Sequence, residues 1–227
     1  MKNIAVIVAG GKGKRMGKPK QFLKIAGKPM LQWTIAPFQR SGMIDGIILV
    51  VAKEQLAPAK KLKYTKIIEV VAGGKERQDS VRNGIAALPD LAEIVVIHDG
   101  ARPAVAVRLI EDSIKAAKKY GAAVVGVPVK DTIKQITNAE CRMPNECKII
   151  KTVSRKNLWA AQTPQSFKAS ILRKAYAKLH GQITDDAMAV EKIGIPVKMI
   201  LGAYENSKVT TPGDLKAMEA ILKERGK

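Results

Sequence analysis

Residues 3–16 read NIAVIVAGGKGKRM, in which a run rich in Ile, Val and Ala leads directly into a loop of glycines and basic side chains. Such a continuous apolar run is typical of a strand that is buried on both faces, as in a parallel sheet. Ligands bind at the carboxyl ends of the strands in such sheets, and glycines let backbone N–H groups approach phosphate oxygens. The stretch therefore predicts an α/β fold with an anion-binding loop after its first strand.

Similar apolar runs recur along the chain, and helical patterns alternate with them. The further predicted strands are 46–52, 66–72, 93–97, 122–127 and 196–201, and the predicted helices are 30–40, 77–88, 105–120 and 212–225. The last helix begins at Thr211-Pro212, which is a favourable cap followed by proline at the first helical position. Strands that alternate with helices predict a Rossmann-like, mostly parallel sheet flanked by helices.

The segment 128–152 breaks this alternation. Its short apolar runs carry many charges, and its centre at 138–146 is rich in turn-forming residues. We interpret it as a β-hairpin arm that leaves the main body. No internal repeat or low-complexity linker is visible, so we expect a single domain over 1–227 with an arm at about 128–152.

The bulk composition is that of a globular protein of 227 residues, a size that needs no disulfide or structural metal to bury a core. Cys141 and Cys147 have no histidine close by, which makes a zinc site a poor interpretation and favours two free thiols in a reducing compartment. The sequence shows no secretory signal and no apolar stretch long enough to span a membrane. We therefore expect a cytoplasmic protein.

The formal net charge is +20, from 40 basic and 20 acidic residues. Such a charge favours anionic partners, which are nucleic acid, an anionic membrane or phosphorylated substrates. The lysines are spread along the chain, and only three Phe, four Tyr and two Trp are available for stacking on bases. We interpret the charge as steering of phosphate substrates, and a basic nucleic-acid-binding module remains the alternative from another class.

Two well-known phosphate-binding loops do not match the first loop. A Walker A loop requires glycine five residues before its Gly-Lys pair, but Lys12 stands at that distance from Gly17. The dinucleotide fingerprint requires a third glycine where Met16 stands, and an acidic residue about 20 positions later, whereas the first acidic residue is Asp45. A hydride-transfer enzyme is thereby disfavoured.

Other polar blocks follow predicted strands. The sequence GGKERQDSV occupies 73–81, and HDGARP occupies 98–103, where Asp99 and Arg102 should face the same crevice as the first loop. We interpret His98 as structural, because a metal-dependent HD phosphohydrolase would need more histidines than His98 and His180. The pair Asp185-Asp186 is typical of a helix start.

The loop AGGKGKRM, followed by PKQ at 19–21, resembles the signature of nucleotidyltransferases that act on sugar and polyol phosphates. Further blocks follow in order: VPVKDTIK at 127–134, TVSR at 152–155, LWAAQTPQ at 158–165, ITDDA at 183–187 and ENSKVTTP at 205–212. Over residues 3–222 the chain resembles the 2-C-methyl-D-erythritol 4-phosphate cytidylyltransferase family. The resemblance implies transfer of a cytidylyl group from CTP to 2-C-methyl-D-erythritol 4-phosphate, which gives 4-diphosphocytidyl-2-C-methyl-D-erythritol and pyrophosphate in the non-mevalonate synthesis of isoprenoid precursors.

The resemblance also implies roles for single residues. Arg15 and Lys20 would stabilise the transition state at the α-phosphate of CTP, and Arg155 would come from the partner subunit of a homodimer formed through the arm. Asp99 would lie beside Mg²⁺, or another divalent cation, held mainly by the CTP phosphates. The implied CTP-binding residues are Ala9, Gly10, Gly11, Gly74, Ser80, Asp99, Gly100 and Lys208. The implied acceptor-binding residues are Asp99, Arg102, Thr132, Arg155, Thr163 and Lys208.

Three features depart from the family pattern. The Ala-Gly-Gly of the first loop and the sequence QSF at 165–167 resemble the corresponding sequences of the ribitol-5-phosphate cytidylyltransferases. Lys75 stands where the family frequently has an acidic residue. The blocks VSRKNLW at 153–159, TDDA at 184–187 and VPVKDTIK favour methylerythritol phosphate as the acceptor, and ribitol 5-phosphate remains the alternative.

Overall fold

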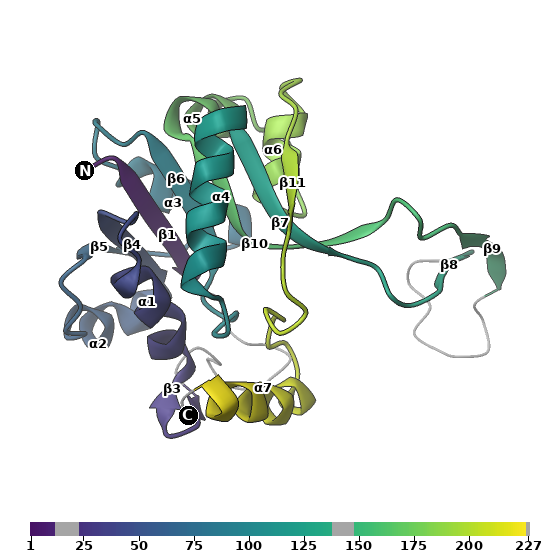
Figure 1. The fold of residues 1–227 in the computed structure, drawn as a ribbon. Helices are drawn as coiled ribbons and strands as arrows, with labels where there is room; N and C mark the ends of the chain where they lie inside the picture. The colour runs from purple at the N-terminus through teal and green to yellow at the C-terminus, as the bar shows by residue number, and fades with distance from the viewer. Residues whose placement is uncertain (12–22, 138–147, 226–227) are drawn as a thin grey trace.

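The structure is a computed structural model that describes residues 1–11, 23–137 and 148–225. Its centre is a seven-stranded sheet in the order β11-β7-β10-β6-β1-β4-β5 (Figure 1). The strands are β1 (Asn3–Ala9), β4 (Gly46–Val51), β5 (Ile67–Ala72), β6 (Ile94–Asp99), β7 (Ala122–Pro128), β10 (Trp159–Lys168) and β11 (Lys198–Leu201). Every pairing is parallel except those of β10 with β6 and β7. The predicted mostly parallel sheet is confirmed.

Strand β10 was missed by the sequence analysis, although it lies near the middle of the sheet. Its residues are largely polar, and Pro164 interrupts it at a register shift between Ala161 and Gln165, which is where proline is tolerated in a central strand. The buried polar side chains are satisfied by partners from other elements. The Ser166 hydroxyl, for example, lies 2.8 Å from the Ser113 hydroxyl.

Helices cover both faces of the sheet and bury the alternate side chains of each strand (Figure 1). On β1, Ile7 packs in the core beneath α1 and α4, whereas Val6 packs in the core beneath α3, α5 and α6. The helices are α1 (Met30–Arg40), α2 (Leu56–Lys60), α3 (Arg77–Ala86), α4 (Val107–Tyr120), α5 (Ala169–Ala177), α6 (Asp186–Glu191) and α7 (Pro212–Arg225), with a 3-10 turn η3 (Lys53–Gln55). The four predicted helices are present; α2, α5 and α6 were not predicted as helices, although Asp185 does cap α6.

Smaller elements complete the chain. Strands β2 (Lys24–Ile25) and β3 (Lys28–Pro29) form a short hairpin before α1. A third apolar cluster, which contains Met30, Val209 and Met218, packs α7 beside this hairpin and the loop after β6. None of the helices in the described ranges is long and apolar enough to cross a membrane.

The segment after β7 leaves the central sheet. Strands β8 (Ile133–Ile136) and β9 (Ile149–Val153) pair with each other in antiparallel fashion, and Figure 1 shows this arm projecting from the body. Ile149 and Ile150 on β9 are 60% and 56% exposed. Both cysteines fall between the two strands, outside the described residues.

Candidate active site

Asp99 is the last residue of β6, so its side chain lies at the carboxyl edge of the sheet, where α/β folds bind ligands. Its Oδ1 accepts a hydrogen bond from Arg77 Nε at 3.0 Å, and its Oδ2 lies 2.9 Å from Lys208 Nζ and 3.6 Å from Arg102 Nε. Burial would raise the pKa of Asp99, but the three neighbouring cations outweigh it and hold that pKa well below its usual range. Asp99 is therefore ionised throughout the physiological pH range.

Arg77 joins Asp99 to a second buried carboxylate. Its Nη2 donates to Asp186 Oδ2 at 2.8 Å, and the Tyr176 hydroxyl donates to Asp186 Oδ1 at 2.6 Å. Burial would lower the pKa of Arg77, but the charges of Asp186 and Asp99 raise it well above its ordinary value. Arg77 is thereby fixed as a cation between two carboxylates.

The sequence analysis gave no role to Arg77, Asp186 or Tyr176. Arg77 and Asp186 are 109 positions apart, so spacing could not show that they meet. The available signal was weaker: Arg77 begins a helix that follows a glycine loop, and Asp186 belongs to a pair of adjacent acidic residues.

A chain of hydrogen bonds holds the backbone of Asp99. The Asp99 N–H donates to Thr163 Oγ1 at 3.0 Å, and that hydroxyl lies 3.0 Å from His98 Nδ1. The other ring nitrogen of His98, Nε2, lies 3.2 Å from the Arg102 carbonyl oxygen. We assign the tautomer in which Nδ1 accepts from Thr163 and Nε2 donates to Arg102, because it satisfies every partner. His98 is thus a structural residue that positions the loop after β6.

The predicted nucleotide-binding residues of the two glycine loops lie close together. The Gly74 N–H donates to Ser80 Oγ at 3.0 Å. A Cβ atom on Gly10 would lie 3.3 Å from Gly73 Cα and 3.4 Å from Ser80 Oγ, so any larger residue at this position would crowd the second loop. At the end of the neighbouring β6, the Gly100 N–H donates to the Val8 carbonyl at 2.8 Å, which brings Gly100 against Ala9. Gly11 is exposed, and Arg15 and Lys20 lie outside the described residues.

A cavity of about 250 Å³ is lined by four of the six predicted acceptor residues, Asp99, Arg102, Thr163 and Lys208. The remaining lining residues are Arg77, Ala161, Gln162, Gln165, Thr184 and Asp185. Within the described part of the chain, Arg102 Nε is buried and has no hydrogen-bond partner. The cavity therefore offers cationic donors for a phosphate and amide and hydroxyl groups for a small polyol.

Thr132 and Arg155, which were also predicted to bind the acceptor, do not line this cavity. Both are exposed near the base of the arm, where the Arg155 guanidinium donates to the Lys130 carbonyl oxygen. Within one chain the structure does not bring them to Asp99.

The carboxylates that line the cavity are the side chains that could bind a metal ion there. Over the described ranges, no group of three or more His, Cys, Asp or Glu side chains could hold a metal ion, and the cavity is lined by two carboxylates, Asp99 and Asp185. Mg²⁺ in nucleotide-dependent enzymes is commonly bound by one or two carboxylates while substrate phosphates supply other ligands. The residues present fit a metal of that kind, with Asp99 as the protein carboxylate.

Comparison with known proteins gives matches over nearly the full length of the chain. The family model described as 2-C-methyl-D-erythritol 4-phosphate cytidylyltransferase matches residues 3–224. The chain is 44% identical over 230 residues to the protein of that name from Alkaliphilus metalliredigens, covering 97% of this chain and 92% of the relative. It is 46% identical over 232 residues to the protein of that name from Clostridium acetobutylicum, covering 98% of both.

Solved structures agree with the sequence matches. The 4-diphosphocytidyl-2C-methyl-D-erythritol synthase from Anaerococcus prevotii is 30% identical, with a TM-score of 0.84 and coverage of 98% of both chains. The 2-C-methyl-D-erythritol 4-phosphate cytidylyltransferase from Thermus thermophilus is 30% identical, with a TM-score of 0.77 and coverage of 96% of this chain and 98% of the other.

Proposed function

The chain belongs to the 2-C-methyl-D-erythritol 4-phosphate cytidylyltransferase family, and from this membership we propose how its own residues perform the reaction. It is an enzyme that transfers a cytidylyl group from CTP to 2-C-methyl-D-erythritol 4-phosphate in isoprenoid synthesis. The family match does not favour ribitol 5-phosphate as acceptor, and it gives no support to a nucleic-acid-binding module.

In this reaction a phosphate oxygen of the acceptor attacks the α-phosphorus of CTP. A new P–O bond forms, the bond from the α-phosphorus to the bridging oxygen breaks, and pyrophosphate leaves with that electron pair. Phosphoryl chemistry of this kind depends on positioning and charge stabilisation, so the protein needs no covalent nucleophile.

The acceptor is proposed to bind in the 250 Å³ cavity. Arg102 Nε is buried, makes only a long ion pair with Asp99, and has no hydrogen-bond partner among the described residues. Arg102 and Lys208 would bind the acceptor phosphate, while Gln162 and Thr163 lie where they could contact its hydroxyl groups. Arg155 and Thr132 are proposed to contact the acceptor from the arm, with Arg155 supplied by the partner subunit.

CTP is proposed to bind across the adjoining glycine loops, with its base and ribose at Ala9, Gly10, Gly74 and Ser80. Gly11, Gly100 and Lys208 are proposed to contact the phosphates of CTP. Arg15 and Lys20 would stabilise the charge that grows at the α-phosphorus, because fixed cations act most strongly where charge develops.

We propose that Mg²⁺ or another divalent cation enters with CTP and is held by its phosphates, with Asp99 as the protein carboxylate nearest to it. When bound, the metal supplies charge neutralisation on the triphosphate. Asp99 in turn is held by Arg77, which Asp186 fixes from the other side.

The proposed assembly is a cytoplasmic homodimer in which two arms clasp each other across a twofold axis. The exposed Ile149 and Ile150 on β9 support this proposal, because exposed large apolar side chains on a projecting hairpin favour burial against another surface.

The convergence of Arg77, Arg102 and Lys208 on Asp99 is the observation that carries this proposal. Release of pyrophosphate from CTP and Mg²⁺ tests it, with 2-C-methyl-D-erythritol 4-phosphate and ribitol 5-phosphate compared at equal concentrations. We expect the first acceptor to turn over much faster. Equal or faster turnover of ribitol 5-phosphate would reverse the choice of acceptor.

A further inference from the structure

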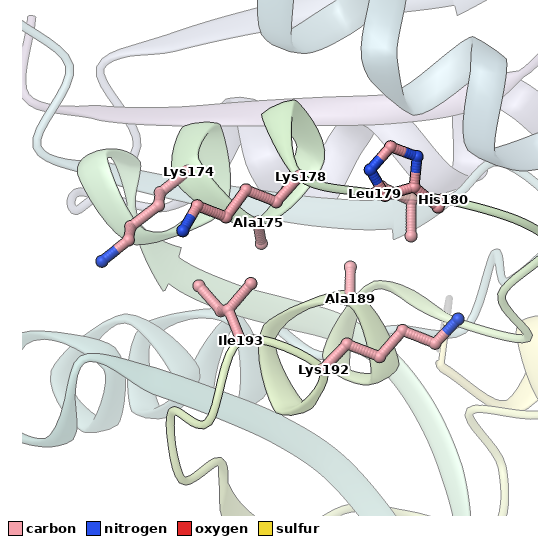
Figure 2. Close-up of a pocket in the computed structure, with 8 residues that line it drawn as sticks. All are labelled: Lys174, Ala175, Lys178, Leu179, His180, Ala189, Lys192 and Ile193. Atoms are coloured by element: carbon pink, nitrogen blue, oxygen red, sulfur yellow. The ribbon is translucent and has the colours of Figure 1, made fainter.

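The cavities of the molecule differ in how their polar side chains are held. A larger cavity between α5 and α6 has a volume of about 480 Å³, and Figure 2 shows the side chains that line it. Its lysines are exposed, and its alanines are packed in the core. The cavity at Asp99 is smaller, but Gln162 and Thr163 in its wall are buried. Their positions therefore depend on hydrogen-bond partners inside the protein.

Asn206 is a partner that Gln162 and Thr163 share. It lies between two exposed residues in the loop after β11, yet its own side chain is fully buried. Its Nδ2 donates to Gln162 Oε1 at 3.1 Å and to the Thr163 carbonyl oxygen at 2.8 Å. Gln162 Nε2 in turn donates to the Ala203 carbonyl oxygen at 2.9 Å. The two side-chain amides thus join the loop after β11 to β10.

Hydrogen bonding allows these two amides only one orientation. The carbonyl oxygens of Ala203 and Thr163 can only accept, so an amide nitrogen must face each of them. With the nitrogens placed in this way, Gln162 Oε1 accepts from Asn206. The space beside the pair is also filled, because a Cβ atom on Gly202 would lie 2.7 Å from Gln162 Oε1. The amide pair therefore holds β10 and the loop in one arrangement.

The backbone of Asn206 contacts a predicted acceptor-binding cation. Its carbonyl oxygen accepts from Arg102 Nη1 at 2.8 Å, and Lys208 lies two residues further along the same loop. Arg102 and Lys208 carry like charges that repel, and both pair with Asp99. The amide contacts of Asn206 are uncharged, so they hold the loop without a bound phosphate. Asn206 does not line the cavity itself, so it acts through the residues that do.

We propose that Asn206 is a positioning residue for the acceptor site. Its side chain fixes Gln162 and the Thr163 carbonyl, and its own carbonyl fixes Arg102. Binding groups from β10 and from the loop after β6 thereby keep one arrangement around the acceptor. This inference rests on the proposed binding of the acceptor in the cavity at Asp99. The proposed site for the base and ribose of CTP shares none of these residues.

Asn206→Ala tests this role, because it removes both side-chain hydrogen bonds and keeps the backbone carbonyl. We expect kcat/KM for 2-C-methyl-D-erythritol 4-phosphate to fall by about 10–10²-fold, since a small displacement of positioned groups has an effect of that order. The affinity for CTP, measured by calorimetry with Mg²⁺ and without the acceptor, should stay close to that of the wild type. Gly202→Ala should give the same selective loss, because its Cβ atom would displace the Gln162 amide.

Asn3→Ala is the matched control. Asn3 is also a buried asparagine, and its Nδ2 donates to the Met43 carbonyl oxygen at 2.7 Å. Its Oδ1, like that of Asn206, has no hydrogen-bond partner among the described residues. Asn3 begins β1, whereas the acceptor cavity lies at the carboxyl edge of the sheet. Its replacement should lower the melting temperature, as Asn206→Ala does, but leave kcat/KM for the acceptor unchanged.

Four outcomes would contradict the inference. Wild-type kcat/KM in Asn206→Ala would overturn the positioning role, and an equal loss in Asn3→Ala would show general destabilisation instead. A loss of CTP affinity as large as the loss for the acceptor would show disruption of the whole site. If Asn206→Ala does not fold, unchanged kinetics in a folded Gly202→Ala enzyme would overturn the role of the amide pair. A wild-type enzyme that does not turn over the acceptor would contradict the proposed function itself.

Discussion

The carboxylate of Asp99 forms ion pairs with Arg77, Arg102 and Lys208. Removing its charge while keeping its shape would leave these cations facing one another and release the Arg77 Nε hydrogen bond. Asp99→Asn should therefore lower kcat by about 10²–10³, the effect expected when a positioned charge is lost from a phosphoryl-transfer site. Pyrophosphate release across a Mg²⁺ titration measures this, and Asp90→Asn on the exposed surface is the matched control. Near-normal turnover at every Mg²⁺ concentration would reduce Asp99 to a structural role.

Arg15 and Lys20 are predicted from the first-loop motif to act on the transition state. Arg15→Ala or Lys20→Ala should mostly lower kcat, again by about 10²–10³, because a charge that acts only as the transition state forms contributes little to substrate binding. Steady-state kinetics with CTP and acceptor varied separately would distinguish the two effects. A variant with wild-type kcat and a raised KM would instead show that the side chain binds the substrate and the transition state equally well.

His98 is buried against Phe38 and remains neutral, because burial lowers its pKa to about 4. In the unfolded chain the pKa of this histidine is near the ordinary value of about 6.5. The contribution of neutral His98 to stability is therefore complete above pH 6.5 and is lost as the pH falls toward 4. Between pH 7 and pH 5 we expect a loss of about 2 kcal/mol in the free energy of unfolding from this group.

Urea unfolding of the wild type and of His98→Gln at both pH values measures this contribution. The variant should show a smaller decrease than the wild type, whereas His180→Gln, at an exposed position, should keep the full decrease. An equal decrease in all three proteins would mean that His98 does not cause it.

At the scale of elements, α3, α5 and α6 meet at one buried carboxylate. Asp185 caps α6 by accepting the Met188 N–H at 3.0 Å, and Asp186 in its first turn faces Arg77 from α3 and Tyr176 from α5. The Gln165 side chain from β10 also accepts the Asp186 N–H at 3.0 Å. Three helices and the antiparallel strand therefore fix the orientation of Arg77, and Arg77 fixes Asp99.

This arrangement predicts the effect of Tyr176→Phe. The change leaves the ring packed but removes the donor to Asp186 Oδ1, and a buried acceptor that loses its partner costs about 1–3 kcal/mol of stability. We also expect a lower kcat, because Arg77 is held less firmly. Urea unfolding and pyrophosphate release measure the two effects, with Tyr120→Phe at an exposed ring as control. Wild-type stability in Tyr176→Phe would show that the hydroxyl contributes nothing.

At the scale of the whole molecule, the arm connects the proposed dimer to the reaction. If Arg155 serves the partner's active site, Arg155→Ala damages that site, whereas Lys20→Ala damages its own. In a mixed dimer one site then collects both defects and the other collects none. About half of the sites in that species should recover, so mixing two inactive variants should restore activity once subunits exchange.

Subunit exchange must be demonstrated separately, for example by energy transfer between labelled chains. A mixture of Lys20→Ala with itself, treated identically, gives the baseline. Activity that stays at this baseline despite exchange would show that Arg155 acts within its own chain, and a monomeric enzyme in solution would contradict the dimer directly.

The sequence by itself determined the strands β1, β4, β6 and β7, because each is an apolar run that is buried on both faces. It also predicted β5 and β11, although β5 at one edge of the sheet is mostly half-buried and β11 at the other edge is largely exposed. It also predicted the glycine loop after β1, whereas only the structure shows how closely Gly10 approaches Gly73. The motif resemblance identified Asp99, Arg102 and Lys208, and the fold brings Lys208 to the other two although it lies more than 100 positions further along the chain.

Only the tertiary structure decided the position of β10 and the role of Arg77. The polar residues of β10 are stable in the middle of the sheet because partners such as Ser113 and Asp185 satisfy them, and those partners come from distant segments. Arg77 and Asp186 show no local pattern that marks them as a pair. They interact because a buried charge without a partner is costly, and in the fold each of the two charges stabilises the other. The partner only has to be close in the folded structure, so its position in the sequence does not reveal it.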